Sequence, residues 1–372
     1  MALKTQQLYT VLTEIMKQIL GDSAIEVVDT NSFVAMGTTV LSSQEVMENF
    51  CNTLVQRITR TIISYRKYNS VLKPLVFGDI EWGGIVQKLK ADMPTAMEDA
   101  AYDLKDGESV DMYIIMKPKV KQKFFVNRTP YSFGVTIQSW QLKRAFLSES
   151  DMNSLITAIF GEIQNSLELA MENLGYLTMG NFIANIAGTE QEVKLITRYN
   201  NETGAGYSGQ PIGILNENRF LRFAISEMLI VADDMRSMRT DFNLEGETRH
   251  TPYDKQRFVA INRFYKKLQT VVQWEAFHAE YVEKTATIEI PRWQSSDNPY
   301  AVKVTDSDGS ETTVDNIIGF IHDRDALGMY RKEQEVLTTP INARGRYVNT
   351  FWHEEQMWFN DLSENGVIFT LS

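Results

Sequence analysis

One long stretch of this sequence carries apolar residues at the period of a single helix. The repeat is close to 3.6 residues and comprises Met152, Ile156, Ile159, Ile163, Leu167, Ala170, Leu174 and Leu177. Residues 148–151 offer a helix N-cap, while Gly161 and Gly175 weaken the helix by about 0.5–1 kcal/mol each. A helix that continues to Ala187 is about 55 Å long, roughly the diameter of a compact globule of this chain length. The sequence therefore predicts a flattened, elongated molecule with one helix as its spine.

An alternating segment leads into this helix and predicts one arm of a projecting, hairpin-like loop. One face of the segment carries Tyr131, Phe133, Val135 and Ile137. A second alternation, VDMYIIMKPKV at 110–120, predicts the other long arm of a β-hairpin. Residues 92–111 are acidic and residues 117–128 are basic. Two interpretations remain open, a solvated hairpin with ordinary surface charge or a projecting loop that docks on a neighbouring subunit.

The N-terminal region, residues 1–84, is predicted to be an arm and a connector. Residues 6–20 form an amphipathic pattern that predicts a helix. Short mixed segments follow, and LVQRITRTIISYRKYNSVLKPL at 54–75 lacks any turn signal that would fold it back. We expect this last segment to be an extended connector.

Residues 214–340 read as an α/β region, and the segment after it reads as aromatic-rich closing strands. A helix is predicted at FLRFAISEMLIVADDMRSM, and strands are predicted at KKLQTVV and ATIEI around a helix-like WEAFHAEYVEK. AVKVTDSDGSETTV predicts a hairpin that turns at Gly309. The final segment predicts a turn at Asn365–Gly366 followed by an apolar strand. No repeat or flexible linker separates these regions, so we expect one continuous body.

Composition and charge limit the possible partners. The net charge of −11 argues against a surface that grips phosphates, because such binding depends on clusters of Lys and Arg. The single cysteine, Cys51, excludes an intramolecular disulfide and a cysteine metal cluster. No apolar run approaches the roughly 18–20 residues that span a bilayer, and the N-terminus lacks the features of a signal peptide. We therefore expect a protein made in the cytoplasm, without a membrane partner.

The search for catalytic motifs returns no convincing site. GAGYSG at 204–209 matches G-x-G-x-x-G, but a polar segment precedes it and Pro211 follows, so a mobile glycine loop is the simpler interpretation. DSDGSETTVDNI at 306–317 fails as a calcium loop because its turn glycine and final glutamate are missing. His353–Glu354 begins H-E-x-x-H, but Met357 occupies the second ligand position. We predict no catalytic, cofactor-binding or metal-binding residue.

Three stretches carry a resemblance to a known family. They are FFVNRTPYSFGVTIQSWQLKRAFLSESDMNSLITAIFGEIQNSLELAMENL, IIGFIHDRDALGMYRKEQEVLTTPINARGRYVNTFWHEEQMWF and, more weakly, LVQRITRTIISYRKYNSVLKPLVFGDIEWGGIV. Together with the order of the elements, they resemble the Hong Kong 97-type major capsid proteins of tailed phages, and are most similar to those of phi29-like podoviruses. The phi29-type protein carries an additional immunoglobulin-like domain at its C-terminus. This chain stops soon after the closing strand, so no role of that domain is carried over.

The resemblance implies an α+β fold in four parts beyond the N-terminal arm. Residues 85–137 would be the extended loop that lies over a neighbouring subunit, and 138–194 the peripheral domain with the spine helix. Residues 195–340 would form the α/β axial domain, which meets its copies around five- and six-fold axes. Residues 341–372 would return to the peripheral domain.

The resemblance also implies a structural function. The chain would assemble with itself, as pentamers and hexamers, into an icosahedral or prolate shell around the phage genome. Implied partners are a scaffolding protein, a portal and packaged DNA held without sequence-specific binding. The protein would reside in the virion after assembly in the bacterial host cytoplasm. Two alternatives are an encapsulin-like nanocompartment shell and, in a different class, a soluble α/β enzyme that uses the loop from Gly204 to Gly209.

Contacts between subunits are expected to use the polarised loop. A closed shell needs unlike surfaces that meet by rotation. Each exposed ion pair contributes only about 0–1 kcal/mol, so charges would set register while apolar residues supply most of the energy. The acidic candidates are Glu98, Asp99, Asp103 and Asp106, the basic candidates are Lys117, Lys119, Lys121 and Lys123, and the apolar candidates are Phe124, Phe125, Tyr131 and Phe133.

Overall fold

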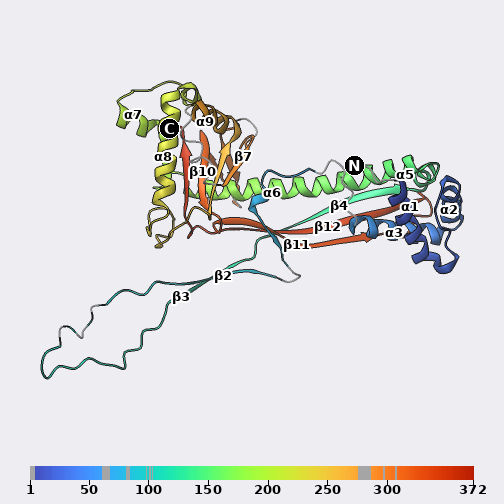
Figure 1. The fold of residues 1–372 in the computed structure, drawn as a ribbon, viewed down its shortest axis with the longest axis horizontal. Helices are drawn as coiled ribbons and strands as arrows, with labels where there is room; N and C mark the ends of the chain where they lie inside the picture. The colour runs from blue at the N-terminus through green and yellow to red at the C-terminus, as the bar shows by residue number, and fades with distance from the viewer. Residues whose placement is uncertain are drawn as a thin grey trace.

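A single helical rod runs along the molecule, as the apolar period predicted (Figure 1). It consists of α5 (Glu149–Ile156), one π turn (Thr157–Gly161) and α6 (Glu162–Ile186). Ser148 caps its N-terminus by accepting a hydrogen bond from the backbone of Asp151 at 3.2 Å. The computed structural model in which it is seen describes residues 5–60, 68–80, 84–97, 99, 102, 104–274, 286–295, 298–305 and 308–372.

A four-stranded sheet lies against the spine helix. Its strands, in spatial order, are β1 (Val76–Asp79), β11 (Leu327–Thr338), β12 (Tyr347–Asn360) and β4 (Arg128–Gln138). The long strands β11 and β12 form an antiparallel pair, and β12 pairs with β4 over the whole length of β4. We call the spine helix and this sheet the peripheral domain.

The N-terminal region is a helical cluster rather than an arm with an extended connector. It comprises α1 (Thr5–Leu20), which confirms the predicted helix, a short turn of 3-10 helix (Gly21–Ser23), α2 (Thr30–Ser42) and α3 (Gln44–Arg60). The expected connector is wrong over Leu54–Arg60, which are helical because Phe50, Cys51 and Leu54 bury one face of α3. Residues 61–67 lie outside the described part, and a 3-10 turn (Lys73–Leu75) leads into β1.

The N-terminal helices bury their apolar faces against the far end of the spine. Their core joins α4 (Ser139–Ala145) and the first turns of the spine helix. Phe146 lies at its centre, with its ring 5.7 Å from that of Phe33 and 5.4 Å from that of Phe50. This second core gives the molecule a blunt helical end opposite the axial domain (Figure 1).

The axial domain is built on a five-stranded sheet. The spatial order is β5 (Glu192–Lys194), β13 (Gly366–Thr370), β10 (Ile317–Asp323), β6 (Gln256–Ile261) and β7 (Ala286–Ile290). Every residue of β10 and β13 is buried. The helices of this domain are α7 (Leu195–Thr203), α8 (Asn218–Asp234) and α9 (Asn262–Trp274), with a 3-10 segment (Pro211–Asn216) before α8.

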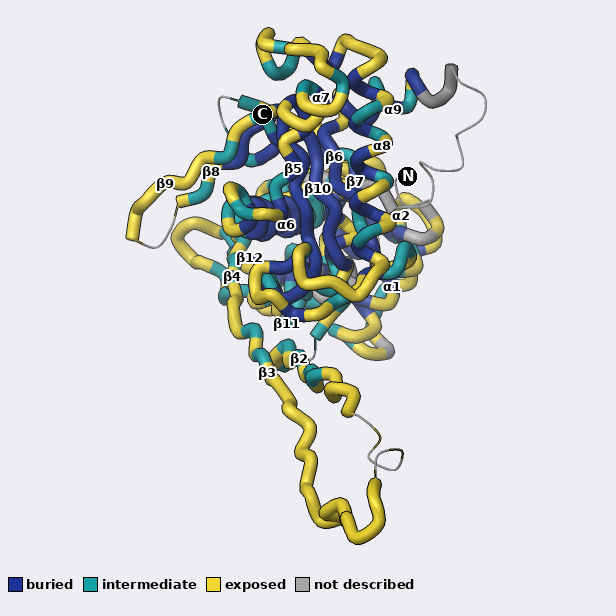
Figure 2. Tube along the Cα trace, turned by 90° about the vertical axis from the view of Figure 1, so that its left-hand side faces the viewer, coloured by how far each residue is buried: buried dark blue, intermediate teal, exposed yellow. Residues whose placement is uncertain are grey.

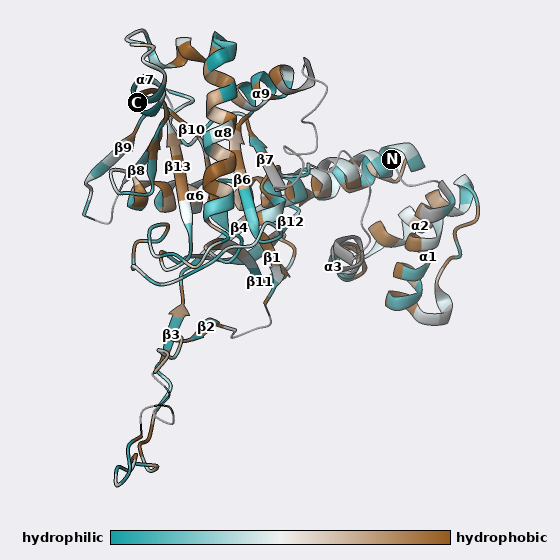
Figure 3. Ribbon diagram, turned by 60° about the vertical axis from the view of Figure 1, so that its left-hand side comes forward, coloured by the Kyte–Doolittle hydropathy of each residue, from teal (hydrophilic) through white to brown (hydrophobic). Residues whose placement is uncertain are grey.

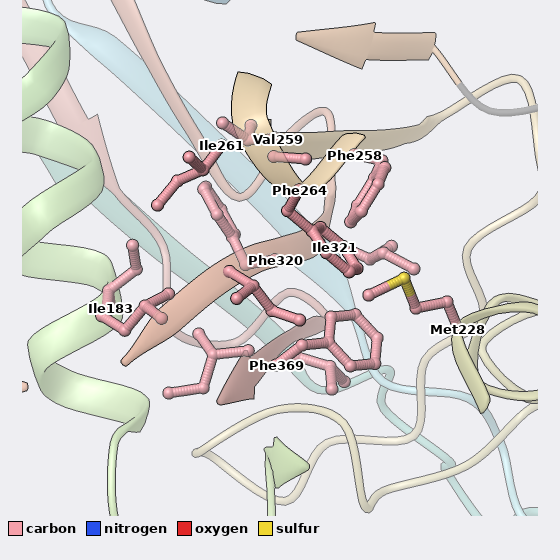
Figure 4. Close-up of a cluster of buried hydrophobic side chains, with 14 of the residues drawn as sticks. Ile183, Met228, Phe258, Val259, Ile261, Phe264, Phe320, Ile321 and Phe369 are labelled. Atoms are coloured by element: carbon pink, nitrogen blue, oxygen red, sulfur yellow. The ribbon is translucent and has the colours of Figure 1, made fainter. Parts of the chain in front are cut away.

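The core of the axial domain reaches the spine helix. Phe320 of β10 and Phe369 of β13 lie at its centre, with Ile183 of the spine on one side and Met228 of α8 on another (Figure 4). One hydrophobic cluster therefore joins the axial sheet to the spine, so the two domains are packed into one body.

Several predictions for residues 195–372 are confirmed and others are wrong. The helix at α8, the strand at β7 and the turn before β13 are confirmed, as is the hairpin of β8 (Val302–Thr305) and β9 (Glu311–Val314) that turns at Gly309. KKLQTVV is part of α9 rather than a strand. Most of WEAFHAEYVEK falls in 275–285, outside the described part. The boundary expected at residue 340 does not separate the sheets, because β11 lies in the peripheral sheet and β13 in the axial sheet.

The extended loop is a β-ribbon at its root only. β2 (Val86–Ala91) pairs with β3 (Val120–Phe125), and the described residues between them form an exposed excursion without strands (Figure 2). The predicted pairing of 110–120 with the 131–138 segment is wrong. That segment pairs with β12 instead, because its apolar face, including Phe133 and Val135, packs against the N-terminal core.

Candidate inter-subunit surfaces

The root of the extended loop presents four lysines on one face. In the register of the ribbon, Lys88 lies opposite Lys123 and Lys90 lies opposite Lys121. Residues two apart on a strand share a face, and like charges directly opposite each other destabilise a strand pair. The ribbon therefore needs anionic partners, and we call these four residues the lysine face.

The carboxylates that neutralise the lysine face belong to the same chain. Lys88 lies 2.6 Å from Asp361 and 2.5 Å from Glu364, two residues in the turn between β12 and β13. Lys123 contacts Asp361 at 2.9 Å and also pairs with Glu245. Glu247 pairs with Lys90 and with Lys121, in the latter case at 2.8 Å, and Lys121 also lies 3.6 Å from Asp92. These pairs fasten the root of the loop to the base of the axial domain.

Because part of this ion-pair cluster is buried, it stabilises the attachment of the loop more than exposed ion pairs would. The side chain of Asp361 is inaccessible to solvent. Desolvation favours its neutral form, but the hydrogen bonds and charges of Lys88 and Lys123 outweigh that effect and hold the pKa of Asp361 far below its usual range. Hydrogen bonds to ionised groups contribute about 1.5–3 kcal/mol each, more than exposed pairs do. The lysine face is thus a structural attachment inside one subunit.

The structure assigns the predicted contact residues to different environments. Lys121 and Lys123 belong to the lysine face, whereas Lys117, Lys119, Asp99 and Asp106 are exposed on the loop. Glu98 and Asp103 lie outside the described residues. The structure contains one subunit, so the assignment of these residues to an interface between subunits remains a prediction.

The four apolar candidates are mostly packed within the subunit. The ring of Phe125 lies 5.1 Å from that of Phe359 on β12. Phe133 packs against the N-terminal core, and its ring is 6.4 Å from that of Tyr131. Only Phe124 among the four is largely exposed, at 58%. Of this group, Phe124 is the side chain most available to a neighbour.

The most exposed apolar segment in the described part of the chain is not among the predicted contact residues. Residues 112–116, MYIIM, extend from the body on the loop, with side chains between 59% and 81% exposed (Figure 3). A continuous exposed apolar segment of this kind marks an interaction surface. The sequence signal for this segment is a run of five apolar residues between an acidic stretch and Lys117, but alternation alone predicts a strand there.

The motifs considered for chemistry are parts of the scaffold. Gly204 ends α7 with a left-handed backbone at φ 65°, and Asn200 fastens the loop by two hydrogen bonds to the backbone of Tyr207 at 2.9 and 2.7 Å. A helix precedes this loop and a 3-10 segment follows it, which is not the strand–loop–helix order of a dinucleotide site. His353 lies on strand β12 rather than on a helix.

Two absences hold over the described part of the chain. Nowhere in it do three or more His, Cys, Asp or Glu side chains gather in a way that could hold a metal ion. Among its helices, none is both long and apolar enough to cross a membrane.

The arrangement of a spine helix, a peripheral sheet, an axial domain and a projecting loop defines a class of protein. Solved phage structures share it. The Staphylococcus phage Andhra capsid matches with a TM-score of 0.53 at 10% identity, covering 83% of this chain and 88% of that chain. A chain in the structure of the head fiber and inner core protein of native bacteriophage P68 matches at 0.57 and 9%, covering 84% and 86%. The chain therefore has the Hong Kong 97-type capsid fold.

The family follows from the sequence comparisons. The chain belongs to the Phi29-like phage major capsid protein family, whose model matches residues 12–370. The major capsid protein of Bacillus phage PZA is 26% identical over 147 residues, which are 40% of this chain and 32% of that protein. That of Bacillus phage GA-1 is 25% identical over 133 residues, or 36% and 27%. The matched regions thus span about a third of the length of these relatives.

Proposed function

We propose that this chain is a phage major capsid protein that assembles with copies of itself into the closed shell of the virion. One observation carries the proposal beyond family membership. The loop exposes the apolar residues 112–116 at a distance from the body, where each side chain keeps more than half of its surface in solvent. An exposed apolar segment of this kind either contacts a partner in an assembly or promotes aggregation of the free subunit.

The shape of the subunit suits heterologous contacts. The blunt helical end, the axial domain and the loop are three unlike surfaces on one elongated body (Figure 1). Contacts between unlike surfaces close into rings when the rotation between copies closes. In this proposal the axial domains meet around the five- and six-fold axes, the peripheral domains form the wall, and the loop lies over the neighbouring subunit.

Further partners belong to the same proposal. A portal, a scaffolding protein and packaged DNA would meet the shell during its assembly in the host cytoplasm. The net charge of −11 suits a wall that encloses DNA without binding it tightly, because such binding depends on neutralising phosphates. The function requires no catalytic step and no cofactor.

Sedimentation of the purified protein tests the proposal. The protein is expressed alone and together with its neighbouring genes, and any fast fraction is imaged by negative stain. We expect closed particles in at least one condition, and particles that require the neighbouring genes would indicate dependence on a scaffold. A monodisperse monomer or dimer in both conditions would contradict the proposal.

A further inference from the structure

A cavity lies where the β8–β9 hairpin meets the spine helix and the end of β12. The hairpin leaves the body beside α6 (Figure 2), and Val302 and Val304 lie against the spine at Gly180. The cavity has a volume of about 560 Å³, within the range of about 300–1,000 Å³ that is typical of ligand pockets. Three separate elements, α6, the hairpin and β12, supply its walls. We call it the hairpin cavity.

The lining of the hairpin cavity is polar but carries no charged side chain among the residues that the structure describes. It combines side-chain amides, hydroxyls and one indole with two small apolar residues. The polar and aromatic members are Asn181, Asn185, Thr305, Thr312, Trp358 and Asn360. The hairpin's own charges, Lys303 and Glu311, pair with each other at 2.8 Å. Because a buried charge needs an opposite charge beside it, this lining favours a neutral ligand over an anion or a cation.

Asn360 presents a hydrogen-bond acceptor that its own subunit leaves unpaired. Its Nδ2 donates to the carbonyl oxygen of Thr178 at 3.0 Å. This bond fixes the orientation of the amide, because only the nitrogen can donate to a carbonyl. The Oδ1 of Asn360 is buried and has no hydrogen-bond partner among the described residues. Since an unpaired buried acceptor is costly, a ligand hydroxyl that donates to this atom would stabilise the site.

Other groups in the lining are also available to a ligand. The side chains of Asn181, Thr305 and Thr312 form no hydrogen bond within the described ranges. Asn185 donates its Nδ2 to the carbonyl oxygen of Asn181 at 2.7 Å, which leaves its Oδ1 as an acceptor. Trp358 packs against the axial core while it also lines the cavity. The cavity therefore offers donors, acceptors and an aromatic surface together.

We propose that the hairpin cavity binds one sugar ring of a neutral saccharide. A pyranose carries several hydroxyls, each of which donates and accepts, around a ring whose C–H face packs on an aromatic side chain. The orphan Oδ1 of Asn360 would accept from one hydroxyl, the amides and hydroxyls of the lining would bind others, and Trp358 would contact the ring. This activity goes beyond the shell function and does not require assembly, so the unassembled subunit is sufficient to measure it.

Ligand-observed NMR of the unassembled subunit tests the site. The probes are the methyl glycosides of glucose, galactose and mannose, together with N-acetylglucosamine and maltotriose. Sorbitol is the control ligand, because it carries similar hydroxyls without a ring. We expect saturable, millimolar binding of at least one sugar and none of sorbitol. Tighter binding of maltotriose than of methyl glucoside would identify a glycan chain as the source of the ring, and equal or weaker binding would identify a free sugar.

A pair of matched variants assigns the binding to this cavity. Asn181→Ala with Thr312→Val removes two polar groups from the lining and should weaken sugar binding by about tenfold or more. The control, Asn173→Ala with Thr313→Val, alters the same residue types on the same helix and the same strand, but neither residue lines the cavity. It should bind as the unaltered subunit does. Urea unfolding of both variants confirms that the subunit remains folded.

Three results would overturn the inference. These are the absence of saturable binding of every sugar to the folded subunit, binding of sorbitol as tight as that of the sugars, or equal weakening in the two variants. The sedimentation assay keeps this test separate from the proposed function. Shells that form from a chain without sugar affinity would remove only the saccharide site, whereas a sugar-binding chain that forms no shells would remove only the shell function.

Discussion

At the scale of single residues, Gly328 is the most tightly enclosed glycine in the peripheral sheet. A Cβ there would overlap the ring of Phe77 and lie 2.9 Å from the ring of Phe359. We expect Gly328→Ala to lower the free energy of unfolding by about 1–3 kcal/mol, because neither ring can move far. Urea unfolding of the unassembled subunit measures this change.

Gly180 supplies the matched control for that substitution. It lies in the spine helix, and a Cβ there would meet no atom closer than 3.4 Å. Gly180→Ala should therefore raise the free energy of unfolding by about 0.5–1 kcal/mol through helix propensity alone. Equal effects at Gly180 and Gly328 would contradict the packing argument.

His322 makes the axial core sensitive to acid. It is fully buried on β10, stacked on Phe320 at 4.8 Å, and its Nε2 has no hydrogen-bond partner. Burial, aided by the charge of Arg257, lowers the pKa of His322 to about 4. Because the folded pKa lies below the unfolded value of about 6.5, this contribution is complete above pH 6.5 and is lost as pH falls toward 4.

The variant His322→Phe isolates that effect. Between pH 7.5 and pH 5, the unaltered subunit should lose roughly 2 kcal/mol more stability than the variant does. Urea unfolding at the two pH values gives the difference, and the common titration of other groups cancels in the comparison. Parallel pH dependences for the two proteins would show that His322 does not titrate as described.

At the scale of elements, the lysine face holds the loop by a buried carboxylate. Removing the charge in Asp361→Asn leaves Lys88 and Lys123 short of a counterion. Amide hydrogen exchange over 86–91 and 120–125 should accelerate by about tenfold or more, the loss of one strong charged hydrogen bond. Since the pKa of Asp361 is depressed, the same opening should occur in the unaltered subunit as pH falls below about 4.

An exposed pair provides the comparison for Asp361. Lys266 and Glu289 lie 3.0 Å apart with both side chains partly exposed. Glu289→Gln should leave exchange in the ribbon unchanged. If Asp361→Asn leaves the rate of amide hydrogen exchange in the ribbon unchanged, then strand pairing alone holds the loop.

Sequence periodicity predicted elements well where one face of an element is buried. The spine helix was predicted because its apolar period persists over many turns. The strand expected at KKLQTVV was wrong because Thr270, Val271 and Val272 favour strands locally, while Phe264, Leu268 and Val271 share the buried face of a helix. The alternation at Tyr131–Ile137 correctly indicated a strand, but alternation does not identify which strand it pairs with.

At the scale of the whole molecule, we expect the loop to be required for assembly but not for folding of the subunit. The described residues between β2 and β3 are almost all exposed. Replacing residues 93–118 by a short Gly/Ser turn should change the free energy of unfolding by no more than about 2 kcal/mol, the entropy of closing a long loop. The same variant should form no shells in the sedimentation assay. Shells of normal yield would contradict the role given to the loop.

The interface was less predictable than the fold for a physical reason. Charge polarity in the loop was visible in the sequence, but the partners of Lys121 and Lys123 are Glu247 and Asp361, far away in the chain. Only the fold shows that these lysines are occupied, whereas Lys143 and Arg344 form no ion pair with any residue that the structure describes. The sequence pattern of a helix or strand indicates which of its faces is buried. A surface between copies depends instead on which charged side chains have no ion-pair partner in the folded subunit.

The position of β13 also affects the order in which the axial domain can fold. This strand lies between β5 and β10, although it is the last strand of the chain. A ribosome must therefore release residues 366–370 before the axial sheet can close. A chain that lacks these residues would leave β5 and β10 without the strand that joins them and would expose the apolar side chains that β13 covers. We therefore expect the axial core to form only after residues 366–370 are available.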